Sequence, residues 1–169
     1  MGRSARSTRF PVGLHIMCIL GLVKLRDGVV YVSSGWMSGS INKNEAMIRQ
    51  ILGRLVNAGL ATSMAGSRGG AIIGKPAEDI TLLDIYKAVE DERIFGVHDG
   101  NEECQIARYV EGYMEMFFED AESQFECELR GVRLSDIVDD MYEEFKKSGF
   151  TPPPYHKLST VSVNKDVAS

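Results

Sequence analysis

The glycine-rich stretch 62–76, TSMAGSRGGAIIGKP, contains residue types that could bind phosphate. Residues 69–75 fit the pattern G-x-x-x-x-G-K, in which backbone N–H groups and a lysine bind the phosphates of a nucleotide. That pattern requires Ser or Thr next, to hold magnesium, and the next residue here is Pro76. Its lysine should also open a helix, whereas the flanking residues favour strands. The stretch therefore predicts a tight hairpin rather than a phosphate-binding loop.

The tip of this hairpin carries a candidate DNA contact. Gly66, Gly69 and Gly70 fit a tight turn that needs positive φ angles. Ser67 and Arg68 then lie at the tip. Because an arginine on a protruding loop can enter a narrow minor groove, where the negative potential is enhanced, we predict that Ser67 and Arg68 contact DNA. A solvent-exposed loop arginine is the alternative.

The three cysteines, Cys18, Cys104 and Cys127, are an odd number without motif spacing. This usage indicates a reducing, cytoplasmic compartment. Cys104 is a candidate redox sensor because it falls near a helix N-terminus, although Glu102 and Glu103 oppose a thiolate. An ordinary thiol is the alternative.

No pattern of catalytic or metal-ligating residues can be argued from spacing. The nearby His98, Asp99 and Cys104 match no strong metal-binding motif, and no Ser-His-Asp or paired-carboxylate arrangement is present. The sequence therefore predicts neither a metal site nor an enzyme.

Charge divides the chain into two unlike halves. Residues 1–76 carry ten Lys/Arg and two Asp/Glu, a net charge of +8, whereas residues 77–150 carry seven and 21, a net charge of −14. A basic block of this size attracts a polyanion and releases its counterions on binding. We therefore expect double-stranded DNA to bind the first half.

The elements of that half follow the order of a winged helix-turn-helix. An apolar helix is expected from Pro11 to near Leu25. The segment 29–35 is expected to be a short strand that runs into the start of a two-turn helix at Ser33 or Ser34. Asn44 caps a longer helix with a buried stripe of Ile, Ile, Leu and Leu at i, i+3, i+4 and i+7, which Gly59 ends. Two short strands around the glycine-rich turn complete a fold that is mainly α with a small β-hairpin wing.

The polar face of the longer helix supplies the candidate reading residues. The N-terminal end of such a helix meets base edges, and Asn, Gln and Arg have the donors and acceptors that recognise adenine and guanine. Lys43 is expected to contact a phosphate. Glu45 supports the cap or accepts from a cytosine. The predicted DNA-binding residues of this region are Lys43, Asn44, Arg49, Gln50 and Arg54.

The second half predicts a dimerisation element. After a helix capped by Thr81, an apolar pattern begins near Cys104 and continues for about 25 residues, or roughly 38 Å. A helix of this length projects beyond a small domain, and its wide apolar face needs a partner, which predicts a homodimer. Packing against its own domain is the alternative. A last helix is expected to be capped at Ser135.

The sequence predicts three regions: a winged helix-turn-helix domain over 1–90, a dimerisation region over 91–150 and a flexible tail over 151–169. No apolar run reaches the length that a membrane span requires. The run 10–23 is preceded by three arginines, as in a signal peptide, but it lacks a cleavage site and is expected to be a buried helix.

The recognition helix, the wing and the following ITLLDIYKAVE segment resemble the Rrf-two (Rrf2) family of bacterial winged-helix transcription regulators. The resemblance covers roughly residues 8–145 and implies a dimeric DNA-binding regulator, usually a repressor. The matching positions are Arg49, Leu52, Leu55, Ala58, Gly59, Leu60, Gly66, Gly69, Gly70, Pro76, Ile80, Thr81, Leu82, Asp84, Ile85, Ala88, Val89 and Glu90.

Two departures qualify this resemblance. Family members commonly carry an arginine just before the first glycine of the wing, where this chain has Ala65. Cluster-binding members carry three cysteines at the start of the dimer helix, where this chain has only Cys104, with Val110 and Met116 where further thiols are needed. We therefore expect no iron–sulfur cluster and no other cofactor.

These observations predict a homodimeric regulator that binds a palindromic operator, and the resemblance implies that it is a repressor. The alternative is a protein-interaction module that has kept the fold and lost DNA binding. The sequence names no effector.

Overall fold

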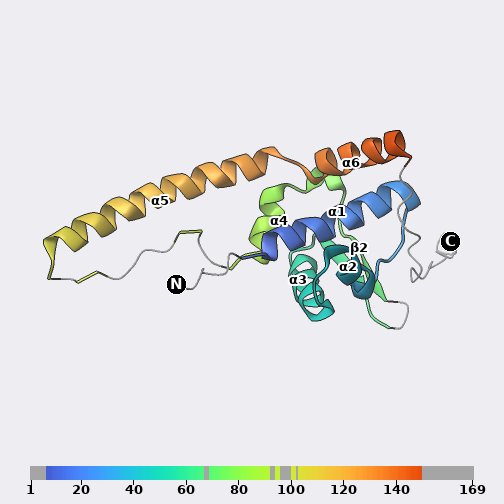
Figure 1. The fold of residues 1–169 in the computed structure, drawn as a ribbon, viewed down its shortest axis with the longest axis horizontal. Helices are drawn as coiled ribbons and strands as arrows, with labels where there is room; N and C mark the ends of the chain where they lie inside the picture. The colour runs from blue at the N-terminus through green and yellow to red at the C-terminus, as the bar shows by residue number, and fades with distance from the viewer. Residues whose placement is uncertain (1–6, 67–68, 92–93, 96–99, 102, 150–169) are drawn as a thin grey trace, which may run out of the picture.

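The computed structural model describes residues 7–66, 69–91, 94–95, 100–101 and 103–149. Helices dominate, and the described strands form one two-stranded sheet (Figure 1). The elements are α1 (Arg9–Asp27), α2 (Ser34–Ile41), α3 (Glu45–Asn57), β1 (Ala61–Met64), β2 (Gly70–Ile73), η1 (Ala77–Asp79), α4 (Leu82–Val89), α5 (Gln105–Gly131) and α6 (Leu134–Ser148).

Helix α1 is the centre of the N-terminal body. Its middle is apolar on every side, and Ile16 and Met17 are fully buried. Figure 1 shows α6 on one side of α1 and α2, α3 and the wing on the other. The predicted buried helix is confirmed, although it continues to Asp27 rather than ending near Leu25. None of the described helices has the length and hydropathy to cross a membrane.

Side-chain caps and left-handed residues shape the helix-turn-helix. The Ser33 hydroxyl accepts from the Trp36 N–H at 3.2 Å and starts α2, and Asn42, at φ 54°, ends it. The Asn44 side chain accepts from the Met47 N–H at 2.8 Å, which confirms the predicted cap of α3. Gly59, at φ 72°, follows the end of α3 as expected.

The predicted buried stripe of α3 is confirmed. Each of its four members is at most 8% exposed, so α3 has one orientation on the body and its polar face is directed to solvent. These members are Ile48, Ile51, Leu52 and Leu55.

The wing is an antiparallel hairpin in which Ala61 pairs with Ile73 and Met64 with Gly70. Gly66 has the expected positive φ of 111°, but Gly69 and Gly70 do not. Glycine is required at both positions because another backbone segment lies too close to leave room for a side chain. A Cβ on Gly69 would lie 2.4 Å from the Met64 carbonyl oxygen, and one on Gly70 would lie 2.6 Å from that of Val32.

The expected short strand in the segment 29–35 is wrong, but the helix start expected at Ser33 or Ser34 is confirmed, since α2 begins at Ser34 with Ser33 as its cap. Only Val32 pairs, as an isolated antiparallel bridge to Ala71 with both N–H···O distances at 2.9 Å. The chain turns into α2 directly after this bridge, because the Ser33 cap begins the helix. The bridge fixes the base of the wing to the segment that precedes α2.

Helix α4 begins with the capping box that Thr81 predicts. The Thr81 hydroxyl accepts from the Asp84 N–H, and the Asp84 carboxylate accepts from the Thr81 N–H at 2.8 Å. Burial would raise the pKa of the Asp84 carboxyl. The hydrogen bonds from Thr81, with help from Lys75 and Lys87, lower that pKa below its usual value.

Helix α6 returns to the N-terminal body. Leu82 N–H donates to the Val132 carbonyl at 3.0 Å, and Leu134 N–H donates to the Ile80 carbonyl at 2.8 Å. Leu134 and Val138 are buried in the common core. The predicted cap at Ser135 is wrong: Arg133 precedes the helix, and its N–H donates to the Asp136 carboxylate at 2.9 Å.

Helix α5 has 27 residues, or about 40 Å, which confirms the predicted long helix. It has no buried residue and extends away from the body (Figure 1). Near the body, Phe125 contacts the Tyr86 ring edge-on at 5.4 Å. Farther out, Phe118 stacks on Phe95 at 4.8 Å. The predicted tail over 151–169 lies outside the described residues.

Substitution of Gly70 by alanine is expected to destabilise the fold by about 1–3 kcal/mol, because the new methyl group meets the Val32 carbonyl. The matched control is Gly53→Ala in α3, where a Cβ meets nothing within 4 Å. That change should stabilise the protein by about 0.5–1 kcal/mol. Urea unfolding of both variants measures the difference. A Gly70→Ala variant as stable as the wild type would contradict the close approach.

Candidate nucleic-acid interface

The exposed face of α3 and the wing border one groove of about 760 Å³. Figure 1 shows α3 and the wing on the same side of α1. Its helix side includes Glu45, Arg49 and Asn57 beside the apolar Leu52 and Val56, and its wing side includes Gly66, Gly69 and Gly70. It is lined by Ser33, Ser34, Gly35, Glu45, Arg49, Leu52, Gly53, Val56, Asn57, Ser63, Met64, Ala65, Gly66, Gly69 and Gly70.

Glu45 positions an arginine in this groove. The Arg49 guanidinium donates to Glu45 Oε1 at 2.5 Å, and the Ser34 hydroxyl donates to the same oxygen at 2.8 Å. The side chain of Arg49 nevertheless remains 59% exposed. Glu45 therefore joins α2 to α3 and orients a cation that is still accessible to a ligand. The sequence suggested a supporting role for Glu45, but it did not reveal Ser34 as the second partner.

The predicted residues at the start of α3 are also exposed. Lys43 is exposed, and its carbonyl accepts from the Ser38 hydroxyl at 2.6 Å, which fixes the backbone of the turn. The Asn44 carbonyl oxygen is used by the cap, and its NH₂ group remains as a donor. Gln50 is exposed one turn before Gly53. The predicted tip residues Ser67 and Arg68 lie outside the described residues.

Comparison with known proteins decides the family. The model of the Rrf2 family, described as "Iron-dependent Transcriptional regulator", matches residues 6–140. This chain belongs to the Rrf2 family. It is therefore a transcriptional regulator and not an enzyme, and its winged helix is the fold of that family.

Relatives agree with this assignment. The chain is 28% identical over 138 residues to the putative HTH-type transcriptional regulator YwnA of Bacillus subtilis, covering 80% of this chain and 98% of YwnA. Its fold is similar to that of CymR, the global cysteine regulator of B. subtilis, with a TM-score of 0.57 at 24% identity over 82% of this chain and 98% of CymR. The fold is also similar to that of a putative transcriptional regulator from Lactobacillus plantarum. The TM-score is 0.65 at 23% identity, over 85% of this chain and 99% of that protein.

Arg54 has an intramolecular role in this Rrf2 regulator. Its guanidinium donates through both terminal nitrogens to the Asp91 carboxylate, with Nη2 at 2.8 Å from Oδ2, and to the Val89 carbonyl at 3.3 Å. Arg9 pairs with Asp91 as well, at 2.8 Å. The hydrogen bond from Arg54 lowers the pKa of the Asp91 carboxyl. Asp91 thus connects α3, the start of α1 and the end of α4.

Sequence reasoning missed this network because Asp91 is 37 positions from Arg54. No periodic pattern links the two residues. Arg54 also does not line the groove, in contrast to Arg49. The assignment of Arg54 to DNA remains a prediction from the sequence, and the contacts favour a structural role.

The cysteines do not fit an iron–sulfur cluster held by one chain. Cys18 is buried in α1, and its burial raises the pKa of the thiol to about 11. Cys104 precedes α5 and Cys127 lies near its other end, 23 residues or about 34 Å along the helix. No group of three His, Cys, Asp or Glu in the described part of the chain could hold a metal ion. The redox role of Cys104 stays a prediction.

Arg54 and Asp91 are expected to be energetically coupled. In a double-mutant cycle with Arg54→Ala and Asp91→Ala, the double variant should lose less stability than the sum of the single variants, because each single change removes the same ion pair. Chemical denaturation of the four proteins measures the coupling. The pair Arg49→Ala and Asp91→Ala should be additive. Additive effects for Arg54 and Asp91 would contradict a direct interaction.

Proposed function

We propose that this Rrf2 regulator is a homodimer that binds double-stranded DNA, with α3 in the major groove and the wing against the adjacent backbone or minor groove. The observation that carries the proposal is the shared groove between α3 and the wing, which the exposed Arg49 lines, whereas Lys43, Asn44 and Gln50 are exposed but do not line it. The first half of the chain, which builds this groove, has a net charge of +8. Such a surface attracts a polyanion at long range.

The contacts divide into two kinds. Arg49, Gln50 and the amide of Asn44 are placed to hydrogen-bond base edges, because they project from the N-terminal half of α3. Lys43, at the start of the helix, suits a phosphate. At the tip of the wing, Ser67 and Arg68 are proposed to contact DNA, as the sequence predicts. Arg54 holds α3 to Asp91 and is therefore not among the proposed DNA contacts.

The exposed apolar stripe of α5 supports the homodimer. Ile106, Tyr109 and Tyr113 are 74%, 82% and 64% exposed, and they share one side of the helix with Val110 and Phe117. An apolar stripe of this length is costly in water and is typical of a protein–protein interface. The described contacts of α5 within its own chain use a neighbouring side of the helix, through Phe118 and Phe125.

A two-fold dimer would present two copies of α3 to one duplex. Half-sites about 34 Å apart, one turn of DNA, would then form a palindromic operator. Occupation of an operator that overlaps a promoter excludes polymerase, so repression is the activity we propose. A protein that acts on the chromosome of a bacterium works in the cytoplasm.

Two substitutions should separate base reading from backbone contact. Gln50→Ala is expected to relax base preference at one position by about 1–3 kcal/mol. Arg68→Ala should instead weaken binding to all duplexes and lower the slope of log affinity against log salt by about one. Fluorescence anisotropy across a salt series, with operator fragments selected from genomic DNA and with random duplex, measures both effects.

Arg130→Ala is the control for loss of positive charge, because Arg130 is exposed on α5 and far along the chain from the groove. It should leave both affinities nearly unchanged. If the wild-type protein does not bind random duplex at low salt, the DNA-binding proposal fails and a protein-interaction module takes its place. An unchanged base motif for Gln50→Ala would reject its reading role.

Phe117→Glu should convert the dimer to a monomer, because it buries a charge in the proposed interface. Glu115→Lys is the matched control: Glu115 is exposed but lies about 200° around α5 from Phe117. Light scattering coupled to size-exclusion chromatography gives the mass, and circular dichroism confirms that both variants remain helical. A wild-type protein that elutes as a monomer would reject the dimer.

A further inference from the structure

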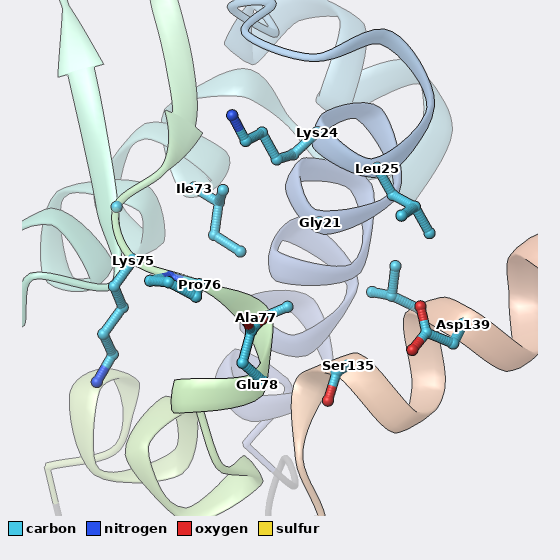
Figure 2. A pocket seen from close by; sticks show the side chains of 12 residues that line it. Gly21, Lys24, Leu25, Ile73, Lys75, Pro76, Ala77, Glu78, Ser135 and Asp139 are labelled. Carbon is cyan, nitrogen blue, oxygen red and sulfur yellow. The ribbon is translucent and has the colours of Figure 1, made fainter.

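A second cavity lies at the base of the wing. It has a volume of about 460 Å³ and opens between the C-terminal end of α1, the segment after β2, η1 and the start of α6 (Figure 2). This volume is in the range of small-molecule sites. None of its lining residues belongs to the groove between α3 and the wing.

The walls of the cavity are mainly aliphatic. Val138 and Gly21 form the contact between α6 and α1 at its floor, where a Cβ on Gly21 would lie 2.9 Å from Val138 Cγ2. Leu25, on the rim, is 47% exposed, although it follows directly on the buried part of α1. Ile73 and Ala77 are half-buried on the facing side. A ligand with an apolar group would cover these side chains.

Opposite charges face the cavity from two elements. Figure 2 shows Lys24 extending from α1 toward the wing side, whereas the Asp139 carboxylate comes from α6 on the other side. Within the described part of the chain, neither side chain has an ion-pair or hydrogen-bond partner. The Ser135 hydroxyl and the Glu78 side chain also belong to the lining.

Lys75 also lines the cavity, but its charge is directed elsewhere. In Figure 2 its ammonium points away from Lys24 and Asp139. Its positive charge instead helps to lower the pKa of Asp84 in α4. The cavity therefore offers the Lys24 ammonium and the Asp139 carboxylate on separate walls, with an aliphatic surface between them and the Glu78 carboxylate on η1 as a further acidic group.

We propose that this cavity binds a short aliphatic peptide with free termini, a zwitterion whose ammonium and carboxylate stand at opposite ends of an apolar chain. The ligand carboxylate pairs with Lys24, its ammonium pairs with Asp139, and its side chains cover Leu25, Val138 and Ile73. Each charged contact adds a charge-assisted hydrogen bond, and both must form for full affinity. A purely anionic or purely cationic ligand would leave one of the two charged walls unpaired.

The two charged ends of such a ligand would link α6 to α1, and its side chains would also cover Ile73 at the base of the wing. Ile73 ends β2, and Pro76 and Ala77 follow it within the same lining. Binding would therefore stiffen the connection between the wing and the segment that follows α5. The binding step itself does not depend on the DNA-binding proposal, so it is tested without DNA.

Isothermal titration calorimetry of the full chain is the test, with L-leucyl-L-leucine as the probe and L-leucine as the comparison, because the two charges of leucine share one carbon atom. Isoamylamine lacks the carboxylate of leucine, and isocaproic acid lacks its ammonium. We expect L-leucyl-L-leucine to bind at least about tenfold more tightly than L-leucine, isoamylamine and isocaproic acid.

Lys24→Gln and Asp139→Asn should each weaken the binding of L-leucyl-L-leucine by at least about tenfold. Asp140→Asn is the matched control, because Asp140 is the next residue of α6, is exposed, and does not line the cavity. Circular dichroism shows whether the variants are folded. The proposal is overturned if L-leucyl-L-leucine produces no heat, if L-leucine or a singly charged analogue binds equally well, or if Asp139→Asn binds like Asp140→Asn.

Discussion

The burial of α1 on all its sides is the constraint on which the rest of this structure depends. A helix that is apolar all round cannot be half solvated, so other elements must cover each of its faces. Glycines allow this cover to be close: a Cβ on Gly13 would lie 3.0 Å from Val89, and one on Gly21 would lie 2.9 Å from Val138. As a result α4 and α6, which come from the acidic second half, are packed onto the basic first half.

This packing also determines which side of α3 is available to a ligand. The buried stripe of α3 fixes its rotation about its own axis, and the Asn44 cap fixes where it starts. Two carboxylates then hold its ends: Glu45 links the first turn to α2, and Asp91 holds Arg54 near the last turn. Since Asp91 stands where the chain leaves the body toward α5, the recognition helix is anchored to the connection with the proposed dimer element.

The same packing separates the polar, apolar and concave surfaces of the molecule. Donors of α3 and the wing gather on one side of α1, and the exposed apolar stripe is confined to α5, which extends from the body (Figure 1). The aliphatic cavity lies between α6 and the base of the wing, at the contact between the two chain halves. Each surface can therefore meet a partner of different chemistry without obstructing the others.

Local signals in the sequence determined most of the elements. Asn44, Thr81 and Gly59 act through hydrogen bonds and backbone angles within a few residues, and the stripe of α3 follows from helical periodicity, so each could be recognised from the chain alone. The length of α5 followed for the same reason. The cap at Ser135 failed because Arg133 pairs with Thr81 in an isolated bridge, and this pairing sets the start of α6.

Tertiary structure decided the features that join residues distant in sequence. The close approach of Gly70 to Val32, the carboxylate that holds Arg54, and the return of α6 to α1 leave no periodic trace, because the partners are 37 or more residues apart in each case. The glycines of the wing illustrate the difference. Their presence indicated a hairpin, but only the packed backbone explains why Gly70 can carry no side chain. Composition and periodicity report local geometry, whereas contact between distant segments is set by the shape of the folded core.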